Sequence, residues 1–362
     1  MRVAVRRAMR AVGRTRPNPC VGAVVARDGR IISVGHHVRA GEPHGEINAL
    51  RAAGEAARGA DLYVTLEPCS HHGRTPPCAD AVIAAGVGRV FVATRDLNPR
   101  VSGRGVEKVR AAGIPVVEGL CQAQAQAVLE PFFTWVTTGR PLVVLKAATS
   151  LDGRIATSTG DSRGLSGKAA HAWLHRLRDR VDAILVGVGT VLADNPRLTP
   201  RRPPIRGKGP QRLVRVVLDS SLRTPVTAAL FEDVSQHPLR IFCAPDAPED
   251  ARLALEARGA VVRRVQRGAG GLDLEAVWVE LGREGVTSVL VEGGAGIHGS
   301  VLESRTADRV ALVVAPRLLG ERGVPLTHWQ GPAHLAQGIR IERVKLRKLG
   351  EDALFEGLVR YP

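Results

Sequence analysis

The sequence has 362 residues, which is long enough for two domains with separate hydrophobic cores. The formal net charge is +16, but aromatic residues make up only 3% of the chain, which disfavours a protein that stacks single-stranded nucleic acid. The five cysteines lack disulfide-like spacing, which argues against a disulfide-rich secreted scaffold and indicates a reducing compartment.

Two further features predict the location of the protein. Residues 1–16 alternate Arg with Ala and Val and lack the uninterrupted apolar stretch of a signal peptide. No run approaches the ~20 apolar residues that a membrane-spanning helix needs. We therefore expect a cytoplasmic protein that acts on a small molecule and binds neither nucleic acid nor a membrane.

The amino-terminal half alternates short β-branched runs with Ala-rich stretches. Asp28-Gly29 is a turn pair, and it predicts a hairpin between strands at 21–26 and 31–37. Strands that alternate with helices indicate a layered α/β domain. Further strands are expected at 61–65, 89–93 and 114–117, and helices at 46–57, 78–85, 103–112 and 122–138.

A break follows the last of these helices at Gly139-Arg140-Pro141, because Gly ends a helix and Pro does not restart one. We place the domain boundary there, which gives domains at 1–139 and 140–362. The second domain is also predicted to be α/β, with a mostly parallel sheet. Its strands are expected at 142–147, 183–188, 213–218, 240–243, 261–265, 288–291 and 310–314, and its helices at 168–178, 249–257 and 274–284.

The most informative pattern is a set of zinc ligands with a separate carboxylate. His44, Cys69 and Cys78 supply three ligands, and a catalytic zinc site leaves its fourth position to water, whereas a structural site is closed by four protein ligands. Zinc lowers the pKa of bound water to about 7. Glu46 would then carry a proton from water to a leaving amine, as the non-ligand Glu does in nucleobase deaminases.

The second half offers a phosphate cradle instead of a metal cluster. The strand at 288–291 runs into Glu292-Gly293-Gly294-Ala295-Gly296 and then into an expected short helix. Glycines at such a turn let main-chain N–H groups approach a pyrophosphate at the helix amino terminus. Taken alone, this segment could also be a Gly-rich turn that has only a structural role.

Both halves resemble one known family. Eight residues separate Cys69 from Cys78, where the usual deaminase signature has two, and the run 66–78 closely resembles the deaminase half of the bifunctional riboflavin-biosynthesis deaminase/reductase. Residues 18–22 and 40–46 are similar to the same half. Residues 145–154, 189–199, 217–220 and 291–294 resemble the reductase half. The resemblance implies a cytidine-deaminase-like three-layer domain followed by a dihydrofolate-reductase-like domain that uses NADPH.

The resemblance also implies two consecutive reactions. The first domain would remove the ring 2-amino group of 2,5-diamino-6-(5-phosphoribosylamino)pyrimidin-4(3H)-one by hydrolysis, with Asn18 holding the base. The second would reduce the ribosyl chain of 5-amino-6-(5-phosphoribosylamino)uracil to ribityl by hydride transfer from NADPH to the sugar C1. Lys146 and Glu292 are the candidates for proton handling there, and a strand-end salt bridge between them is the alternative.

Further residues are assigned by the same resemblance. His71 and His72 belong to an insert that faces substrate, so they rank below the three zinc ligands, and Cys20, Cys121 and Cys243 are taken as ordinary thiols. The implied cofactor contacts are Ala148, Gly164, Thr190, Asp194, Ser220, Gly294, Ala295, Gly296, Ile297, His298, Gly299 and Ser300. The implied contacts with the phosphorylated sugar are Ser162, Arg178, Leu198, Arg201 and Glu292, with the two arginines suited to a phosphate by their bidentate geometry.

Three departures from the family pattern bear on function. Gly164 lies where the family usually has Trp, so one wall of the cofactor pocket lacks its ring. Residues 96–99 read Asp-Leu-Asn-Pro in place of Asp-Pro-Asn-Pro. Gly45 replaces the usual Ala between His44 and Glu46, at a cost of up to ~1 kcal/mol for the helical turn.

Other functions remain open at this point. A nucleic-acid or nucleoside deaminase fused to a binding domain is one, although the cysteine spacing and the few aromatic residues count against it. A structural zinc module is another, although it would need a fourth Cys or His at finger spacing. One half could also have lost its activity. NADH in place of NADPH, and a homo-oligomer, are likewise open.

Overall fold

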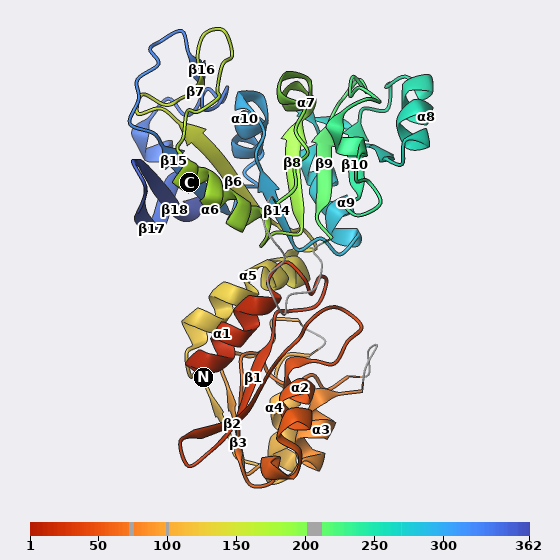
Figure 1. The fold of residues 1–362 in the computed structure, drawn as a ribbon, viewed down its shortest axis with the longest axis vertical. Helices are drawn as coiled ribbons and strands as arrows, with labels where there is room; N and C mark the ends of the chain where they lie inside the picture. Colours follow the sequence, from red (N-terminus) through yellow and green to blue (C-terminus); the bar gives the residue numbers. More distant parts are fainter. Residues whose placement is uncertain (72–75, 99–100, 201–211, 269) are drawn as a thin grey trace. The chain divides into compact units, whose positions relative to one another are not determined.

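The computed structural model describes residues 1–362 except 72–75, 99–100, 201–211 and 269. The chain divides between Arg140 and Pro141 into two compact units (Figure 1). Met1–Arg140 belong to unit 1, and the described residues from Pro141 onward form unit 2. Each unit has its own hydrophobic core. Among the described residues, no helix is both long and apolar enough to cross a membrane.

Unit 1 is built on a five-stranded sheet of order β2-β1-β3-β4-β5. The hairpin predicted across Asp28-Gly29 is confirmed, and both turn residues have positive φ angles, 51° and 75°. β1 also pairs antiparallel with β3, whereas β3, β4 and β5 are parallel. The strands are β1 (Gly22–Arg27), β2 (Arg30–His36), β3 (Asp61–Val64), β4 (Arg89–Val92) and β5 (Val116–Glu118).

Helices cover both faces of this sheet, with α2, α3 and α4 on one side and α1 and α5 on the other (Figure 1). The predicted three-layer arrangement is therefore present. One helix was not predicted: α1, whose buried residues Ala4, Val5, Ala8 and Ala11 follow a helical period. The helices are α1 (Arg2–Ala11), α2 (Gly45–Ala53), the 3₁₀ turn η1 (Gly54–Ala57), α3 (Cys78–Ala84), α4 (Arg104–Ala111) and α5 (Gln122–Thr138).

Helix α2 lies unusually close to the sheet at Gly35 of β2. A side-chain carbon at this position would overlap the main-chain carbonyl of Gly45 and the main-chain nitrogen of Ala49. The approach is held by hydrogen bonds, since Ser33 Oγ donates to Ala49 O (2.6 Å) and Asn48 Nδ2 donates to His36 O (2.9 Å). The first turn of α2 is thereby fixed against β2.

Unit 2 contains a nine-stranded sheet of order β11-β10-β9-β8-β14-β6-β15-β18-β17. The seven strands from β11 to β15 are parallel, as predicted, and β18 and β17 add an antiparallel edge. These strands are β6 (Leu142–Thr149), β8 (Ala183–Gly187), β9 (Val214–Leu218), β10 (Leu239–Cys243), β11 (Val261–Arg264), β14 (Ser288–Val291), β15 (Arg309–Val314), β17 (Arg340–Leu349) and β18 (Asp352–Arg360).

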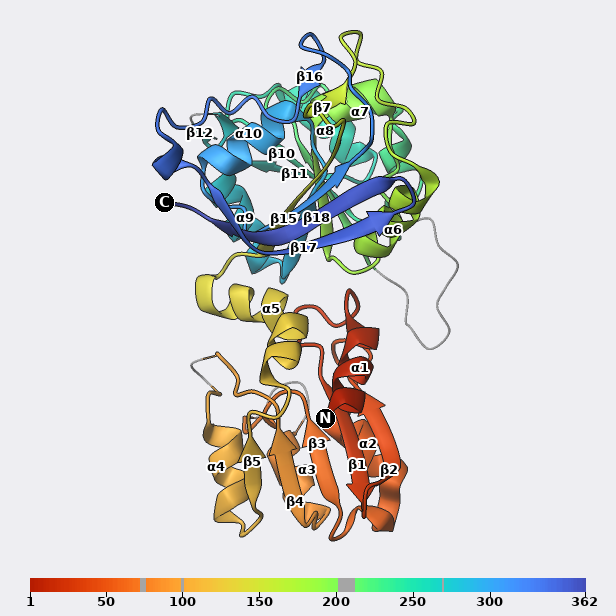
Figure 2. The same cartoon turned by 90° about the vertical axis from the view of Figure 1, so that its left-hand side faces the viewer.

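The remaining elements of unit 2 surround this sheet (Figure 2). α9 begins where the Asp273 carboxylate accepts hydrogen bonds from the N–H groups of Glu275 and Ala276. The helices are α6 (Lys168–Arg178), α7 (Val188–Asp194), α8 (Glu249–Ala257), α9 (Leu274–Arg283) and α10 (Ala295–Glu303), with 3₁₀ turns η2 (Ala229–Phe231) and η3 (Leu335–Gln337). Four short strands are β7 (Arg154–Ala156), β12 (Arg267–Gly268), β13 (Gly271–Leu272) and β16 (Val324–Pro325).

Replacing Gly35 by Ala tests the close helix–sheet contact. We expect Gly35→Ala to lower the free energy of unfolding of unit 1 by about 1–3 kcal/mol, the usual cost of overpacking, and to weaken metal binding because α2 must move. Chemical denaturation with a metal titration measures both effects. Ile31→Ala, at a half-exposed position of the same strand, is the control, and equal stability of the two variants would refute the contact argument.

Candidate active sites

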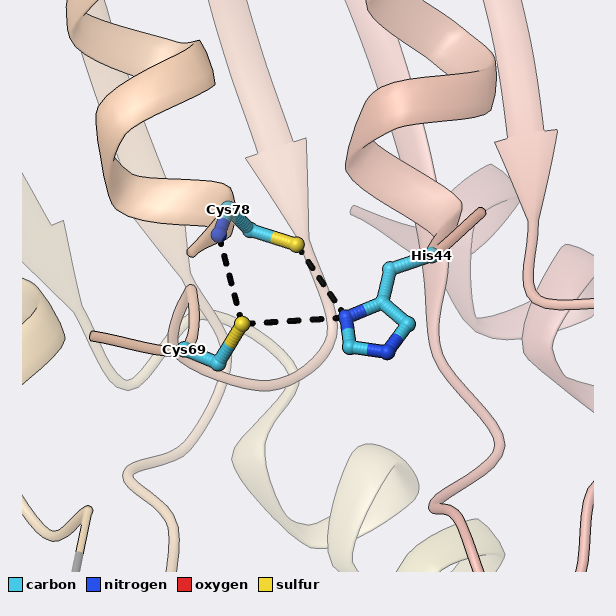
Figure 3. A group of neighbouring side chains, drawn as sticks. All are labelled: His44, Cys69 and Cys78. Atoms are coloured by element: carbon cyan, nitrogen blue, oxygen red, sulfur yellow. Dashed lines mark hydrogen bonds between the residues drawn. The ribbon is translucent and has the colours of Figure 1, made fainter. Parts of the chain in front are cut away.

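The three predicted zinc ligands meet in unit 1 (Figure 3). His44 immediately precedes α2, Cys78 is the first residue of α3, and Cys69 lies in the loop that follows β3. Their ligand atoms all lie within 4.8 Å of one another. His44 Nδ1 is 3.1 Å from Cys78 Sγ and 3.7 Å from Cys69 Sγ. One imidazole nitrogen and two sulfurs at such separations fit three corners of a tetrahedral zinc site.

The electrostatics of the cluster favour a thiolate. The hydrogen bond from Cys78 lowers the pKa of Cys69 to about 4. The main-chain N–H of Cys78 also donates to Cys69 Sγ at 3.2 Å, and the amino terminus of α3 favours negative charge. The Cys69 hydrogen bond and burial raise the pKa of the Cys78 thiol, so the two sulfurs share one proton. Zinc binding releases that proton, because zinc ligands are thiolates.

Glu46 lies in the first turn of α2, beside the cluster and outside it. Its side chain is 3% exposed, and its Oε2 has no hydrogen-bond partner among the described residues. Burial raises the pKa of this carboxyl to about 7. A carboxyl that titrates near neutral pH suits general acid/base catalysis.

A pocket opens onto this cluster, and Asn18 lines it. Sequence reasoning missed a second lining residue, His37, which no spacing signal in the sequence indicated. His37 Nδ1 lies 3.2 Å from the Pro43 carbonyl, so this nitrogen donates. His37 Nε2 is then the acceptor for Asn18 Nδ2, at 3.1 Å. This chain of hydrogen bonds fixes the orientation of the Asn18 amide.

The structure also places other residues of unit 1 that the sequence analysis singled out. His71 lines the pocket, whereas His72 lies outside the described residues. Gly45 is needed for packing in this chain, because a side-chain carbon there would lie 2.7 Å from the Val21 carbonyl oxygen. All five cysteines are free of disulfides.

Unit 2 brings together three charged side chains, from Lys146 of β6, Arg178 of α6 and Glu292, which follows β14. Arg178 on α6 donates two hydrogen bonds to Glu292, at 2.8 and 2.7 Å, with the two side chains 14% and 8% exposed. Burial raises the pKa of Glu292, but Arg178 and Lys146 outweigh it and lower the pKa. Burial lowers the pKa of Lys146, against the attraction of Glu292. The carboxylate's ion-pair partner is therefore Arg178, and not Lys146 as the strand-end alternative supposed.

A second pocket adjoins these charges. It is lined by Lys146 and Glu292, by Ser162, and by most of the implied cofactor contacts: Ala148, Thr190, Asp194, Gly294, Ala295, Gly296, Ile297, His298 and Ser300. The last six belong to the turn between β14 and α10 or to α10 itself. The predicted Gly-rich cradle therefore precedes a helix amino terminus, as an anion site requires.

Five of the implied contacts lie elsewhere. Gly164, Arg178, Ser220 and Gly299 do not line this pocket. Gly299 packs against the main chain of residues 328–329. Leu198 is buried in the hydrophobic core, with a φ angle of 53°. Arg201 lies outside the described residues.

Two family models match different parts of the chain. Residues 1–94 match the model of the cytidine and deoxycytidylate deaminase zinc-binding region, and residues 141–355 match the RibD C-terminal domain. The riboflavin biosynthesis protein RibD of Aquifex aeolicus is 40% identical over 352 residues, covering 97% of this chain and 95% of that protein. The RibD protein of Escherichia coli is 39% identical over 358 residues, covering 96% and 95%.

Solved structures agree over both units. Acinetobacter baumannii RibD has a TM-score of 0.88 at 34% identity, covering 99% of this chain and 97% of that one. A diaminohydroxyphosphoribosylaminopyrimidine deaminase/5-amino-6-(5-phosphoribosylamino)uracil reductase of Thermotoga maritima has a TM-score of 0.84 at 35% identity, covering 100% and 97%.

These similarities confirm the predicted fold classes, a cytidine-deaminase-like domain and a dihydrofolate-reductase-like domain. They also confirm zinc and NADPH as the cofactors. The chain belongs to the RibD family of bifunctional deaminases and reductases of riboflavin biosynthesis.

Proposed function

We propose that residues 1–139 deaminate 2,5-diamino-6-(5-phosphoribosylamino)pyrimidin-4(3H)-one and that residues 140–362 reduce the resulting 5-amino-6-(5-phosphoribosylamino)uracil. The observation that carries the deaminase assignment is the convergence of His44, Cys69 and Cys78 beside the buried carboxylate of Glu46, whose Oε2 has no hydrogen-bond partner among the described residues. The substrates follow from the names of the relatives and from the resemblance in sequence.

In the deaminase, His44, Cys69 and Cys78 would hold the zinc ion. When bound, zinc acts as a Lewis acid that makes a coordinated water acidic. With zinc bound, Glu46 would take a proton from water and pass it to the amine nitrogen. Addition of the water oxygen to ring C2 and cleavage of the C2–N bond would release ammonia, and the second water proton would pass to a ring nitrogen, which leaves the C2 carbonyl of the uracil. A carboxyl with a pKa near 7 both accepts and gives up a proton at neutral pH.

Asn18 is proposed to hold the pyrimidine ring. Its Nδ2 is engaged by His37, which leaves the amide oxygen oriented as an acceptor for an N–H group of the base. His37 in turn depends on the Pro43 carbonyl for its tautomer. The Pro43 carbonyl would thus orient His37, His37 would orient the Asn18 amide, and this fixed amide would orient the ring.

In the reductase, Lys146 and Glu292 are proposed to handle the proton. Hydride addition to the sugar C1, with cleavage of the bond from C1 to the ring oxygen, leaves a negative charge on that oxygen, which one proton must neutralise. Lys146 is the better donor, because burial lowers its pKa. Glu292 is held ionised by Arg178 and would keep the ammonium of Lys146 in place. Arg178, Arg201, Ser162 and Leu198 stay proposals for the phosphorylated sugar, with Arg178 already engaged by a carboxylate.

NADPH is proposed to lie along the second pocket. Residues 294–296 at the start of α10 would take its phosphates, and the cofactor itself supplies the hydride, so the protein's task is placement. Gly164, Ser220 and Gly299 remain assigned by resemblance alone. A small-molecule substrate, without nucleic acid or membrane, and a cytoplasmic location are supported by the concave pockets and the free thiols.

Removing a proposed zinc ligand separates the two activities. Cys69→Ser and Cys78→Ser should each lose stoichiometric zinc and ammonia release, while NADPH oxidation persists when 5-amino-6-(5-phosphoribosylamino)uracil is supplied. Cys121→Ser, at a cysteine outside the cluster, should keep the metal. Metal analysis with separate assays of ammonia and of NADPH absorbance gives the answer. Full zinc occupancy in both ligand variants would disprove the ligand set.

Changing Glu46 to Gln tests proton transfer directly. Glu46→Gln preserves the shape of the side chain but removes its acid/base capacity, so zinc should remain while deamination falls by about 10²–10⁴-fold. Ammonia release at near-normal rate would show that Glu46 is only a helix-start residue.

Changing Lys146 to Met tests the proposed proton donor of the reductase. Lys146→Met should reduce NADPH oxidation by about 10²-fold or more and leave ammonia release unchanged. In the unmodified enzyme the donor must be protonated, so the reduction rate should fall as pH rises through the pKa of Lys146, which burial places below its usual value. Normal reduction by the variant, or a rate that rises over this range, would contradict the assignment.

A further inference from the structure

A second carboxylate of unit 1 is almost fully buried and has no part in the chemistry described above. Glu67 is 3% exposed, lies two residues before Cys69 and lines the deaminase pocket. Its Oε2 has no hydrogen-bond partner among the described residues. Burying an ionisable group without full pairing is costly. Its other oxygen must therefore make interactions that outweigh this cost.

Glu67 Oε1 binds the main chain at two points, at the start and at the end of a loop that lines the pocket. Glu67 Oε1 accepts hydrogen bonds from the main-chain N–H of Asp96 (2.7 Å) and of Gly103 (2.9 Å). We call the described residues between these points, 96–98 and 101–103, the wall loop. Asp96, Asn98 and Val101 of the wall loop all line the pocket. One carboxylate oxygen thus closes a loop whose residues face the substrate site.

Glu67 is itself held firmly on the metal-binding side. Its main-chain N–H donates to Thr94 O at 3.1 Å, which extends the pairing of β3 with β4. The next carbonyl, that of Pro68, lies so close to Gly105 of α4 that a side-chain carbon at residue 105 would overlap it. Cys69 follows directly, and its carbonyl accepts from Ala79 N at 3.1 Å in α3. The segment that carries Cys69 is therefore fixed to the sheet, α4 and α3.

We propose that Glu67 is a positioning residue of the deaminase. Its carboxylate fixes the distance between the wall loop and Cys69, and so holds the substrate ring against the groups that react. Without it, the buried N–H groups of Asp96 and Gly103 lose their acceptor, and unpaired buried N–H groups draw in water or force the loop to move. The zinc ligands, and all of unit 2, retain their own contacts.

Variants of the full-length, zinc-loaded enzyme test this role. Glu67→Ala should raise the KM for the diaminopyrimidinone substrate by about tenfold or more, the scale expected for losing two hydrogen bonds to a charged acceptor. Its kcat should change by less than about threefold, and its zinc content and NADPH oxidation should match those of the unmodified enzyme. Glu67→Gln keeps a carbonyl acceptor at the same place and should restore KM. Glu107→Ala, at an exposed carboxylate of α4, is the matched control.

Several outcomes would overturn the proposal. An unchanged KM in Glu67→Ala would mean that the wall loop does not depend on this carboxylate. Loss of zinc in the same variant would show that Glu67 supports only the metal site. A KM in Glu67→Gln as high as that in Glu67→Ala would show that the hydrogen-bond acceptor at this position is not what matters. If Glu67→Ala fails to fold, Glu67→Asp shortens the side chain by one methylene and should also raise KM, and a normal KM there would again refute the role.

Discussion

The deaminase site depends on one constraint, the meeting of three chain segments within bonding distance of a single cation. His44 and Cys78 come from the starts of two helices, and Cys69 comes from a loop that follows a buried strand. Two of these segments are placed by close main-chain contacts: α2 against Gly35, and Pro68, the neighbour of Cys69, against Gly105. The glycines permit these approaches, so the geometry of the metal site is set by packing that lies outside the ligands themselves.

The two units use buried carboxylates in opposite ways. No described cationic side chain forms an ion pair with Glu46, and burial brings its pKa to about 7, where it exchanges protons. Glu292 is also largely buried, but Arg178 forms two hydrogen bonds with it and keeps it ionised. The proton in the second site is consequently assigned to Lys146. Whether a carboxylate exchanges protons or stays ionised therefore depends more on whether a cationic side chain is bound to it than on how deeply it is buried.

The sequence predicted the sheets and most helices because buried strands and turn pairs such as Asp28-Gly29 leave local signals. It missed β17 and β18, since β17 mixes charged and apolar residues along an exposed edge. It also placed the zinc cluster, whose residue types are distinctive. The roles of His37 and Glu67 were not predictable, because each depends on a partner brought close only by folding. Arg178 was expected to face phosphate, and its pairing with Glu292 likewise joins residues 114 positions apart.

X-ray absorption at the zinc edge is the most direct test of the account, because it counts the ligand atoms around the metal. The site described here predicts two sulfur atoms at about 2.3 Å and two nitrogen or oxygen atoms at about 2.0–2.1 Å, one from His44 and one from water. Three or four sulfur ligands would contradict the ligand set, which contains two cysteines. A second imidazole in place of the water would also contradict the account, since it would leave no position for the attacking water.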